Sequence, residues 1–171
     1  YIAVDPTDES TIYITVSGFS SGQKLYKSTN AGYSFSNISG DLPNVPANCI
    51  AVDFSGDGLY VGTDSGVYYT NDSMNEWKKL DSKLPNVTIT ELEISEKYEK
   101  LWAATWGRGT WQIDIYKSPL AEFSSSEQNI CKDSTINFTD LSENNPTSWY
   151  WEFEGASPAT STEQNPQNIK Y

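Results

Sequence analysis

Short runs of alternating apolar and polar residues follow one another along most of the chain, and turn-forming residues separate these runs. Residues 49–80 illustrate the pattern with the runs "CIAVDF", "GLYVGT", "GVYYTN" and "EWKKL". Val, Ile, Tyr and Trp suit strands, whereas Gly, Asp, Asn and Ser suit tight turns. Helical spacing is nowhere sustained, and residues 90–100 alternate in a way that predicts a strand followed by a charged turn. The pattern therefore predicts an all-β fold.

The strand pattern also repeats along the chain. "LPNV" occurs twice, 42 residues apart, and "LYVGTDSG" at 59–66 aligns with "LWAATWGRG" at 101–109. Four short strands in about 42 residues is the size of one β-propeller blade. A standalone β-sandwich with accidental repetition is the alternative. The repeat predicts a partial β-propeller whose third blade lacks its fourth strand, with blades over 1–41, 42–83 and 84–116.

Two turns of the repeat carry a motif. "STNAGYSF" begins at Ser28, and "TNDSMNEW" begins 42 residues later. Both resemble the Asp-box, Ser-x-Asp-x-Gly-x-Thr-Trp, of sialidase-like, BNR-type and sortilin-type propellers, with Asn30 at the Asp position of the first copy. An Asp or Asn side chain can accept hydrogen bonds from backbone N–H groups of its own turn. The resemblance implies the C-terminal blades of such a propeller, with the remaining blades upstream in the same polypeptide. The residues that it places in structural turns are Ser28, Asn30, Gly32, Phe35, Thr70, Asp72 and Trp77.

The character of the sequence changes beyond residues 1–117. Segment 118–171 resembles the PKD domain, an immunoglobulin-like β-sandwich of large secreted bacterial proteins, through "INFTDLS" and "PTSWYWEFEG". It departs from the family at "EFEGAS", where PKD domains have an Asp-Phe-Gly-Asp-Gly run. Strand alternation places Trp149, Trp151 and Phe153 on one inner face. The resemblance implies a sandwich that is truncated at its C-terminus.

Charge argues against several kinds of partner. The chain of 171 residues has a net charge of −12 and no histidine. Binding to nucleic acid or to an anionic membrane surface depends on clustered Lys and Arg, which this sequence lacks. It also lacks an apolar run long enough for a membrane helix. Without histidine, the commonest metal ligand and general base are missing, so neither a cofactor nor a metal is expected.

Candidate catalytic and calcium sites fail on inspection of the sequence. A sialidase needs an arginine cluster for the sugar carboxylate, and Arg108 is the only arginine. A glycoside hydrolase needs two carboxylates across a cleft, and no such pairing is derivable here. "DFSGDGLYVGTD" places Asp53, Asp57 and Asp64 at the spacing of a calcium-binding loop. A strand inside this stretch would carry Asp64 away from the others, which favours a simple Asp-Gly turn.

One edge of the predicted blades is the candidate binding site. In a blade, the loops between second and third strands share a face with the loops between blades, whereas the Asp-box turns lie on the other face. Ligands of such folds usually contact loops on one face. Trp102 and Trp111 fall on strands and are expected to be packing residues. The candidate ligand-binding residues are Asn48, Asp64, Ser65, Trp106 and Arg108.

The sequence thus favours binding over catalysis. We expect a non-catalytic segment of a large secreted or cell-surface bacterial protein, whose propeller rim binds carbohydrate or an extracellular protein and whose PKD-like domain is a spacer or adhesion module. The alternative is an accessory part of a secreted glycoside hydrolase or peptidase whose catalytic residues lie upstream. The resemblance also implies further domains, among them a sorting domain for type IX secretion. Cys49 and Cys131, in different predicted domains, are expected to be free thiols, with a single disulfide between them as the alternative.

Overall fold

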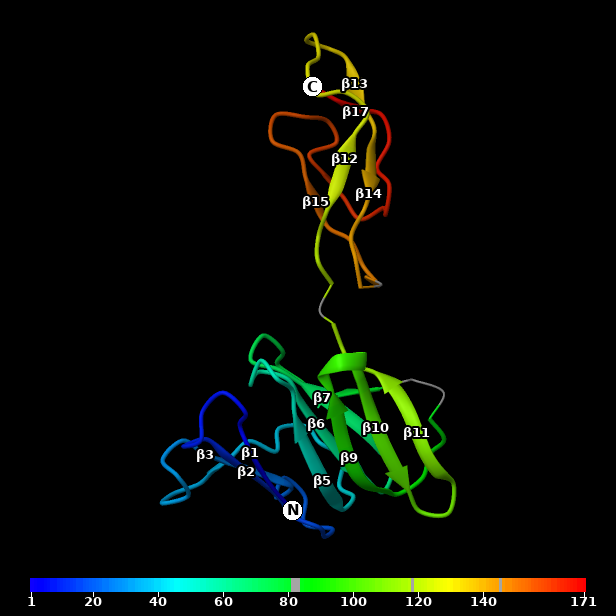
Figure 1. Cartoon of the computed structure of the whole chain (residues 1–171). Coiled ribbons are helices and arrows are strands. Elements are labelled where there is room, and N and C mark those ends of the chain that lie inside the picture. The colour runs from blue at the N-terminus through cyan, green and yellow to red at the C-terminus, as the bar shows by residue number, and fades with distance from the viewer. Residues whose placement is uncertain (81–83, 118, 145) are drawn as a thin grey trace. The chain divides into compact units, whose positions relative to one another are not determined.

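The residues that the computed structural model describes are 1–80, 84–117, 119–144 and 146–171. The chain divides into two compact units, Tyr1–Tyr116 and Lys117–Tyr171, which can be followed by colour in Figure 1. All regular elements in the described ranges are short antiparallel strands, apart from a 3₁₀ turn at Glu96–Tyr98. The prediction of an all-β fold is confirmed. None of the helical structure in these ranges is long and apolar enough to cross a membrane.

The first unit consists of three antiparallel sheets, in each of which the strands pair in chain order, as in propeller blades. Figure 1 shows the second sheet between the other two. The first sheet contains β1 (Ile2–Val4), β2 (Ile12–Thr15), β3 (Leu25–Ser28) and β4 (Ser36–Asn37). The second contains β5 (Ala47–Val52), β6 (Leu59–Thr63), β7 (Gly66–Thr70) and β8 (Lys78–Lys79). The third contains β9 (Ile89–Ser95), β10 (Lys100–Thr105) and β11 (Gly109–Asp114).

The second sheet is buried on both faces because side chains alternate along its strands. On β6, Val61 packs toward the first sheet and Tyr60 toward the third, and neither is exposed to solvent. Tyr13 and Leu25 of the first sheet complete one core. Leu101 and other residues of the third sheet complete the other. Two hydrophobic layers, rather than backbone hydrogen-bond ladders, thus join the three sheets.

The strand connections gather at two opposite edges of these sheets. One edge, called the rim below, carries the turns at 64–65 and 106–108 together with the starts of β5 and β9. The other, called the Asp-box edge, carries the turns at 29–35 and 71–77. Antiparallel pairing forces this separation, because alternate connections of a meander lie at opposite ends of its strands.

The second unit is built from three two-stranded antiparallel sheets around a small core. Phe153 is buried and Trp151 packs against this core, whereas Tyr150 is 68 % exposed, so successive residues of this segment face opposite sides. The buried residues of this core are Ile136, Phe138, Phe153 and Ile169. The strands are β12 (Phe123–Ser125), β13 (Thr135–Ile136), β14 (Phe138–Asp140), β15 (Trp151–Glu152), β16 (Thr160–Ser161) and β17 (Ile169–Lys170).

Candidate functional site

Asn48 joins all three sheets at the rim. Its Nδ2 donates to Asp64 Oδ1 at 2.9 Å and to the Ile89 carbonyl at 3.2 Å, and its Oδ1 accepts from Ser17 Oγ at 3.0 Å. Ser17 follows β2, Asp64 follows β6, and Ile89 begins β9. One amide side chain therefore fixes the relative positions of these elements. The structure brings together Asn48 and Asp64, both expected at the rim, whereas nothing in the sequence pattern singled out Ser17.

The turn between β10 and β11 presents the most exposed indole of the rim. The Trp106 side chain is 78 % exposed, while its backbone N–H donates to the Thr88 carbonyl at 2.9 Å. Trp111 Nε1 donates to the Arg108 carbonyl at 3.1 Å, which braces the turn from inside. Trp102 lies on β10, as expected, and is 39 % exposed. The backbone of this turn is thus held in place while the Trp106 and Arg108 side chains face solvent.

Ser65 has a different environment from its neighbour Asp64. Its N–H donates to Thr63 Oγ1 at 3.0 Å, and its hydroxyl lies 3.2 Å from the Tyr68 hydroxyl. Ser65 is half-buried, whereas Asp64 is exposed. These contacts shape the turn after β6, and the Asp64 carboxylate is the exposed charged group of this turn.

A hydrogen bond between Tyr1 and Glu91 connects the first and third sheets and was not predicted from the sequence. The Tyr1 hydroxyl donates to Glu91 Oε1, a bond that raises the pKa of Tyr1 to about 12, with smaller contributions from burial and from the charges of Glu91 and Glu93. The two residues are 90 positions apart, and no local signal could have paired them. Glu91 and Asp64 thus place two carboxylates near the rim, and Arg108 on the same rim carries a positive charge.

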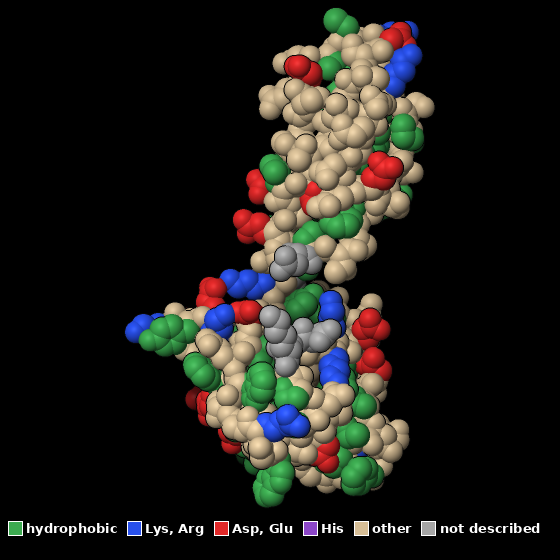
Figure 2. Space-filling model, turned by 90° about the vertical axis from the view of Figure 1, so that its right-hand side faces the viewer, with side chains coloured by type: hydrophobic (Ala, Val, Ile, Leu, Met, Phe, Trp, Pro, Cys, Tyr) green, Lys and Arg blue, Asp and Glu red, His purple; other side chains and the backbone are tan. Residues whose placement is uncertain are grey.

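Charges of both signs are dispersed over the surface. Figure 2 shows acidic side chains interspersed with lysine and arginine on the displayed face, without one dominant basic patch. A binding surface for a polyanion needs clustered basic residues. The displayed face offers none.

The first Asp-box turn is held by its own side chains. Ser28 Oγ accepts from the Gly32 N–H at 2.9 Å, and Asn30 Oδ1 accepts from the Ser34 N–H at 2.9 Å. Phe35 is 39 % exposed beside this turn. The polar atoms of Ser28 and Asn30 are therefore engaged in fixing the backbone.

The second Asp-box turn uses a different residue. Asn71, not Asp72, accepts from the backbone two residues on, at 3.1 Å from the Ser73 N–H. Asp72 instead donates its own N–H to Asp57 Oδ1 at 2.7 Å, and Thr70 Oγ1 donates to the Glu76 carbonyl at 3.3 Å. The shift of one residue follows from Met74 at the position where the motif has glycine, because glycine tolerates backbone angles that methionine disfavours. Trp77 packs against the core between the first and second sheets.

The acidic residues with calcium-loop spacing do not converge. Asp53 and Asp64 lie at opposite ends of β6. Asp53 Oδ1 accepts from the Ser55 N–H at 3.0 Å, which closes a local turn. Across the described part of the chain, no group of three or more His, Cys, Asp or Glu residues is placed to hold a metal ion.

The two cysteines are both free thiols. Cys49 is buried between the second and third sheets, and burial, supported by the charge of Glu91, raises its pKa to about 12. Cys131 is exposed in the second unit. The raised pKa leaves the Cys49 thiol protonated and therefore not activated as a nucleophile, because that role needs a lowered pKa.

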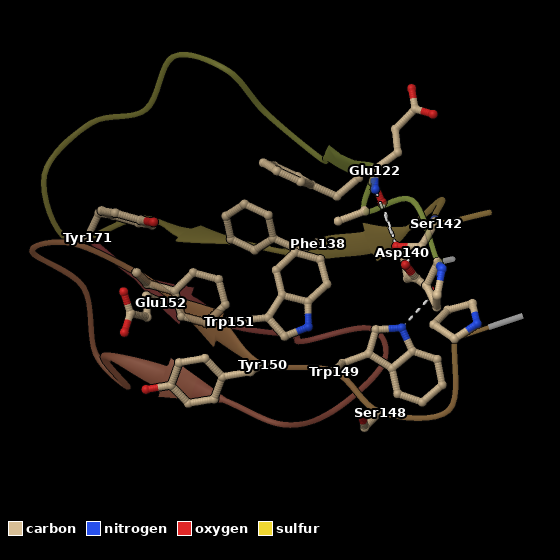
Figure 3. Close-up of a pocket in the computed structure, with 15 residues that line it drawn as sticks. Glu122, Phe138, Asp140, Ser142, Ser148, Trp149, Tyr150, Trp151, Glu152 and Tyr171 are labelled. Carbon is tan, nitrogen blue, oxygen red and sulfur yellow. Dashed lines mark hydrogen bonds between the residues drawn. The ribbon is translucent and has the colours of Figure 1, made fainter. Parts of the chain in front are cut away.

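The second unit contains a cavity of about 500 Å³ lined largely by aromatic rings. Figure 3 shows Phe138, Trp149 and Trp151 along its wall, with Tyr150 and Tyr171 nearby. The Phe138 and Trp151 ring centroids are 5.9 Å apart, within the range of favourable aromatic contacts. This size is within the range of small-molecule sites, but the rings are also the core of a small domain.

Asp140 anchors one wall of this cavity. Its carboxylate accepts from the Ser142 N–H at 3.0 Å, from Gln164 Nε2 at 3.0 Å and from Trp149 Nε1 at 2.9 Å. The hydrogen bonds from Ser142 and Gln164, with that of Trp149, hold the pKa of Asp140 at about 2. The dashed line to the Trp149 indole in Figure 3 marks the contact that orients this ring.

Comparison with known proteins supports the fold only. No family profile and no curated protein matches the sequence. Two crystal structures of an extracellular domain from B. thetaiotaomicron, described as part of a hybrid two-component and of a one-component system, superpose with TM-scores of 0.51 and 0.50 at 16% and 17% identity. Each superposition covers 81% of this chain and 20% of that domain, so the chain spans about a fifth of its neighbours. An ancestral GH74 enzyme superposes with a TM-score of 0.45 at 16% identity, over 99% of this chain and 26% of the enzyme.

Proposed function

We propose that this chain is a non-catalytic binding and display segment of a secreted or cell-surface bacterial protein. The rim of the first unit binds a glycan or an extracellular protein, and the second unit is a PKD-like spacer or adhesion module. Two crystal structures of one extracellular domain, which superpose on this chain with TM-scores of 0.51 and 0.50, support an extracellular setting. The propeller in this proposal includes further blades of the same polypeptide.

The observation that carries the proposal is the exposed Trp106 indole on a braced turn. An aromatic face fixed by its backbone can stack on the apolar face of a sugar ring or on a protein side chain with little loss of entropy. Asp64, held by Asn48 across the sheets, supplies an acceptor for hydroxyl or amide donors. Arg108 offers a planar set of donors on the same turn as Trp106.

Binding by variants on a glycan array and to immobilised extracellular proteins tests this site. Trp106→Ala and Arg108→Ala are each expected to weaken binding roughly thirtyfold, the loss typical of a binding hot spot. Tyr33→Ala is the matched control, because Tyr33 is 92 % exposed but lies on the Asp-box edge of the same unit. Unchanged binding by both rim variants, or an equal loss in Tyr33→Ala, would contradict the proposal.

A further inference from the structure

The cavity of the second unit is lined by more aromatic rings than the core of this unit buries. Phe138 belongs to the buried core, and Trp151 packs against it. Phe123, Trp149 and Tyr150 also line the cavity, but none of them is buried. Phe123 is 60 % and Tyr150 68 % exposed. Rings that line a cavity and stay accessible to solvent are available to a ligand.

The rings around this cavity are inclined to one another. The ring centroids of Phe123 and Trp151 are 5.6 Å apart with an angle of 74° between the planes, and those of Phe138 and Trp151 are 5.9 Å apart at 47°. Because rings inclined this steeply do not stack face to face, and because Phe123 is largely exposed, π surface remains open to the cavity. The face of an aromatic ring carries a partial negative charge. The cavity therefore presents an apolar but electronegative wall.

The charged side chains of the cavity have the same sign. Glu122, Asp140 and Glu152 line it, and the described lining contains no lysine or arginine. Figure 3 shows Asp140 beside the Trp149 indole, with Glu122 and Glu152 at the margins. Residues 118–171 carry eight Asp or Glu side chains against two Lys, so the surroundings are acidic as well. An anionic ligand would be repelled, whereas a cation would be attracted.

The indole N–H groups of the cavity already have partners. Trp149 Nε1 donates to Asp140 Oδ2 at 2.9 Å, and Trp151 Nε1 donates to the Glu163 carbonyl at 2.8 Å. These two rings therefore offer their faces rather than hydrogen-bond donors. A sugar, which is oriented through its many hydroxyl groups, would gain little from such a wall. The wall suits a ligand that is cationic and makes few hydrogen bonds.

We infer that this cavity binds a quaternary ammonium ion. Such an ion carries a positive charge on an apolar methylated surface and has no N–H to donate, and aromatic faces attract it through the ring quadrupole. The carboxylates of Glu122, Asp140 and Glu152 strengthen the attraction. The second unit, for which the proposed function gives only a spacer or adhesion role, thus has a small-molecule site of its own, independent of the rim.

Calorimetric titration of the full chain with choline chloride at constant ionic strength tests the inference. Choline is expected to bind with a Kd of roughly 1 mM or lower, and to shift the NMR signals of the Trp149 and Trp151 indole N–H groups. Its neutral analogue, in which carbon replaces the quaternary nitrogen, should bind at least about tenfold more weakly because it lacks the charge. Equal binding of the two compounds, or no binding of choline at roughly 50 mM, would overturn the inference.

Variants of the full chain locate the site. Phe123→Leu keeps apolar surface but removes a π face at an exposed position, and should weaken choline binding about fivefold without affecting the neutral analogue. Glu122→Gln with Glu152→Gln should weaken it about threefold. The matched control, Glu127→Gln with Glu154→Gln, removes the same charge from exposed positions outside the cavity and should have less effect. Full affinity in Phe123→Leu, or equal losses in the two glutamine pairs, would contradict the assignment.

Discussion

Single side chains with several fixed partners organise both units. Asn48 bonds to groups from three sheets, and Asp140 accepts hydrogen bonds from three different residues of the second unit. Each side chain holds together segments that are distant in sequence, which an ordinary surface residue does not do. Substitution of either residue should therefore affect segments other than the strand that carries it.

The low pKa of Asp140 predicts an acid-sensitive second unit. Because its pKa is lowered to about 2 in the folded chain and is about 3.9 in an unfolded one, its contribution to stability is present above pH 4 and is lost as the pH falls toward 2. The NMR signal of the Trp149 indole N–H, which donates to this carboxylate, reports the change. Asp140→Asn should remove the pH dependence in this interval, whereas Glu154→Gln, at an exposed site, should retain it. An unaltered profile in Asp140→Asn would show that another group titrates.

The two Asp-box turns differ in which residue supplies the acceptor, and this predicts unequal effects of substitution. Asn30→Ala removes the bond to the Ser34 N–H and should lower the free energy of unfolding by about 1 kcal/mol. Asp72→Ala should stay within about 0.5 kcal/mol, because the Asp72 backbone N–H, which contacts Asp57, is retained. Urea unfolding of both variants measures the difference. Equal losses would show that Asp72 acts as the motif suggests.

At the scale of elements, strand β6 is the most constrained part of the first unit. All five of its residues are buried, and the Tyr60 hydroxyl accepts from the Tyr116 N–H at 2.9 Å, which ties the end of the unit to its middle sheet. Burial raises the pKa of Tyr60, in keeping with a neutral hydroxyl held between two sheets. Because successive side chains of β6 point to opposite faces of the second sheet, this one strand contributes to both hydrophobic layers.

Gly62 lies where the second and third sheets pack tightly against each other. A Cβ at this position would overlap Cys49 Sγ and lie 2.7 Å from Ile89 Cγ2. Gly62→Ala is expected to lower the free energy of unfolding by about 1–3 kcal/mol, as overpacked cores do. Gly18→Ala is the control, since a Cβ there meets nothing within 4 Å. Equal stability of the two variants in urea unfolding would mean that the sheets separate more easily than their packing implies.

The periodicity of the sequence is sufficient to predict where the strands lie, but it does not predict the contacts between the sheets. Alternation and turn residues locate β5 to β7 because these signals are local. The bonds of Asn48 to Ser17 and of Tyr1 to Glu91 connect residues that only the packing of sheets brings together. The aromatic cavity of the second unit depends in the same way on tertiary structure. The motif was a poor guide at the second Asp-box turn, where the local backbone moves the acceptor to Asn71.

At the scale of the whole molecule, charge is the dominant property. The net charge of −12 at pH 7 and a pI near 4.2 predict repulsion from polyanions and between copies of the chain. The chain should pass unretained through a heparin or DNA column at about 0.15 M salt, and its solubility should be lowest near pH 4.2. Retention that decreases with added salt would reveal a basic site that the charge distribution does not indicate.

The absence of hydrogen-bond ladders between the three sheets has a mechanical consequence. A polypeptide pulled by its ends resists most where strands must shear along shared hydrogen bonds, and here such bonds stop at the boundary of each described sheet. Under tension the first unit should therefore yield sheet by sheet. Release of either four-stranded sheet would free about 42 residues, or roughly 140–150 Å of extended chain, and the three-stranded third sheet would free fewer. A surface protein built this way would lengthen in steps under load before its bond to a binding partner ruptured.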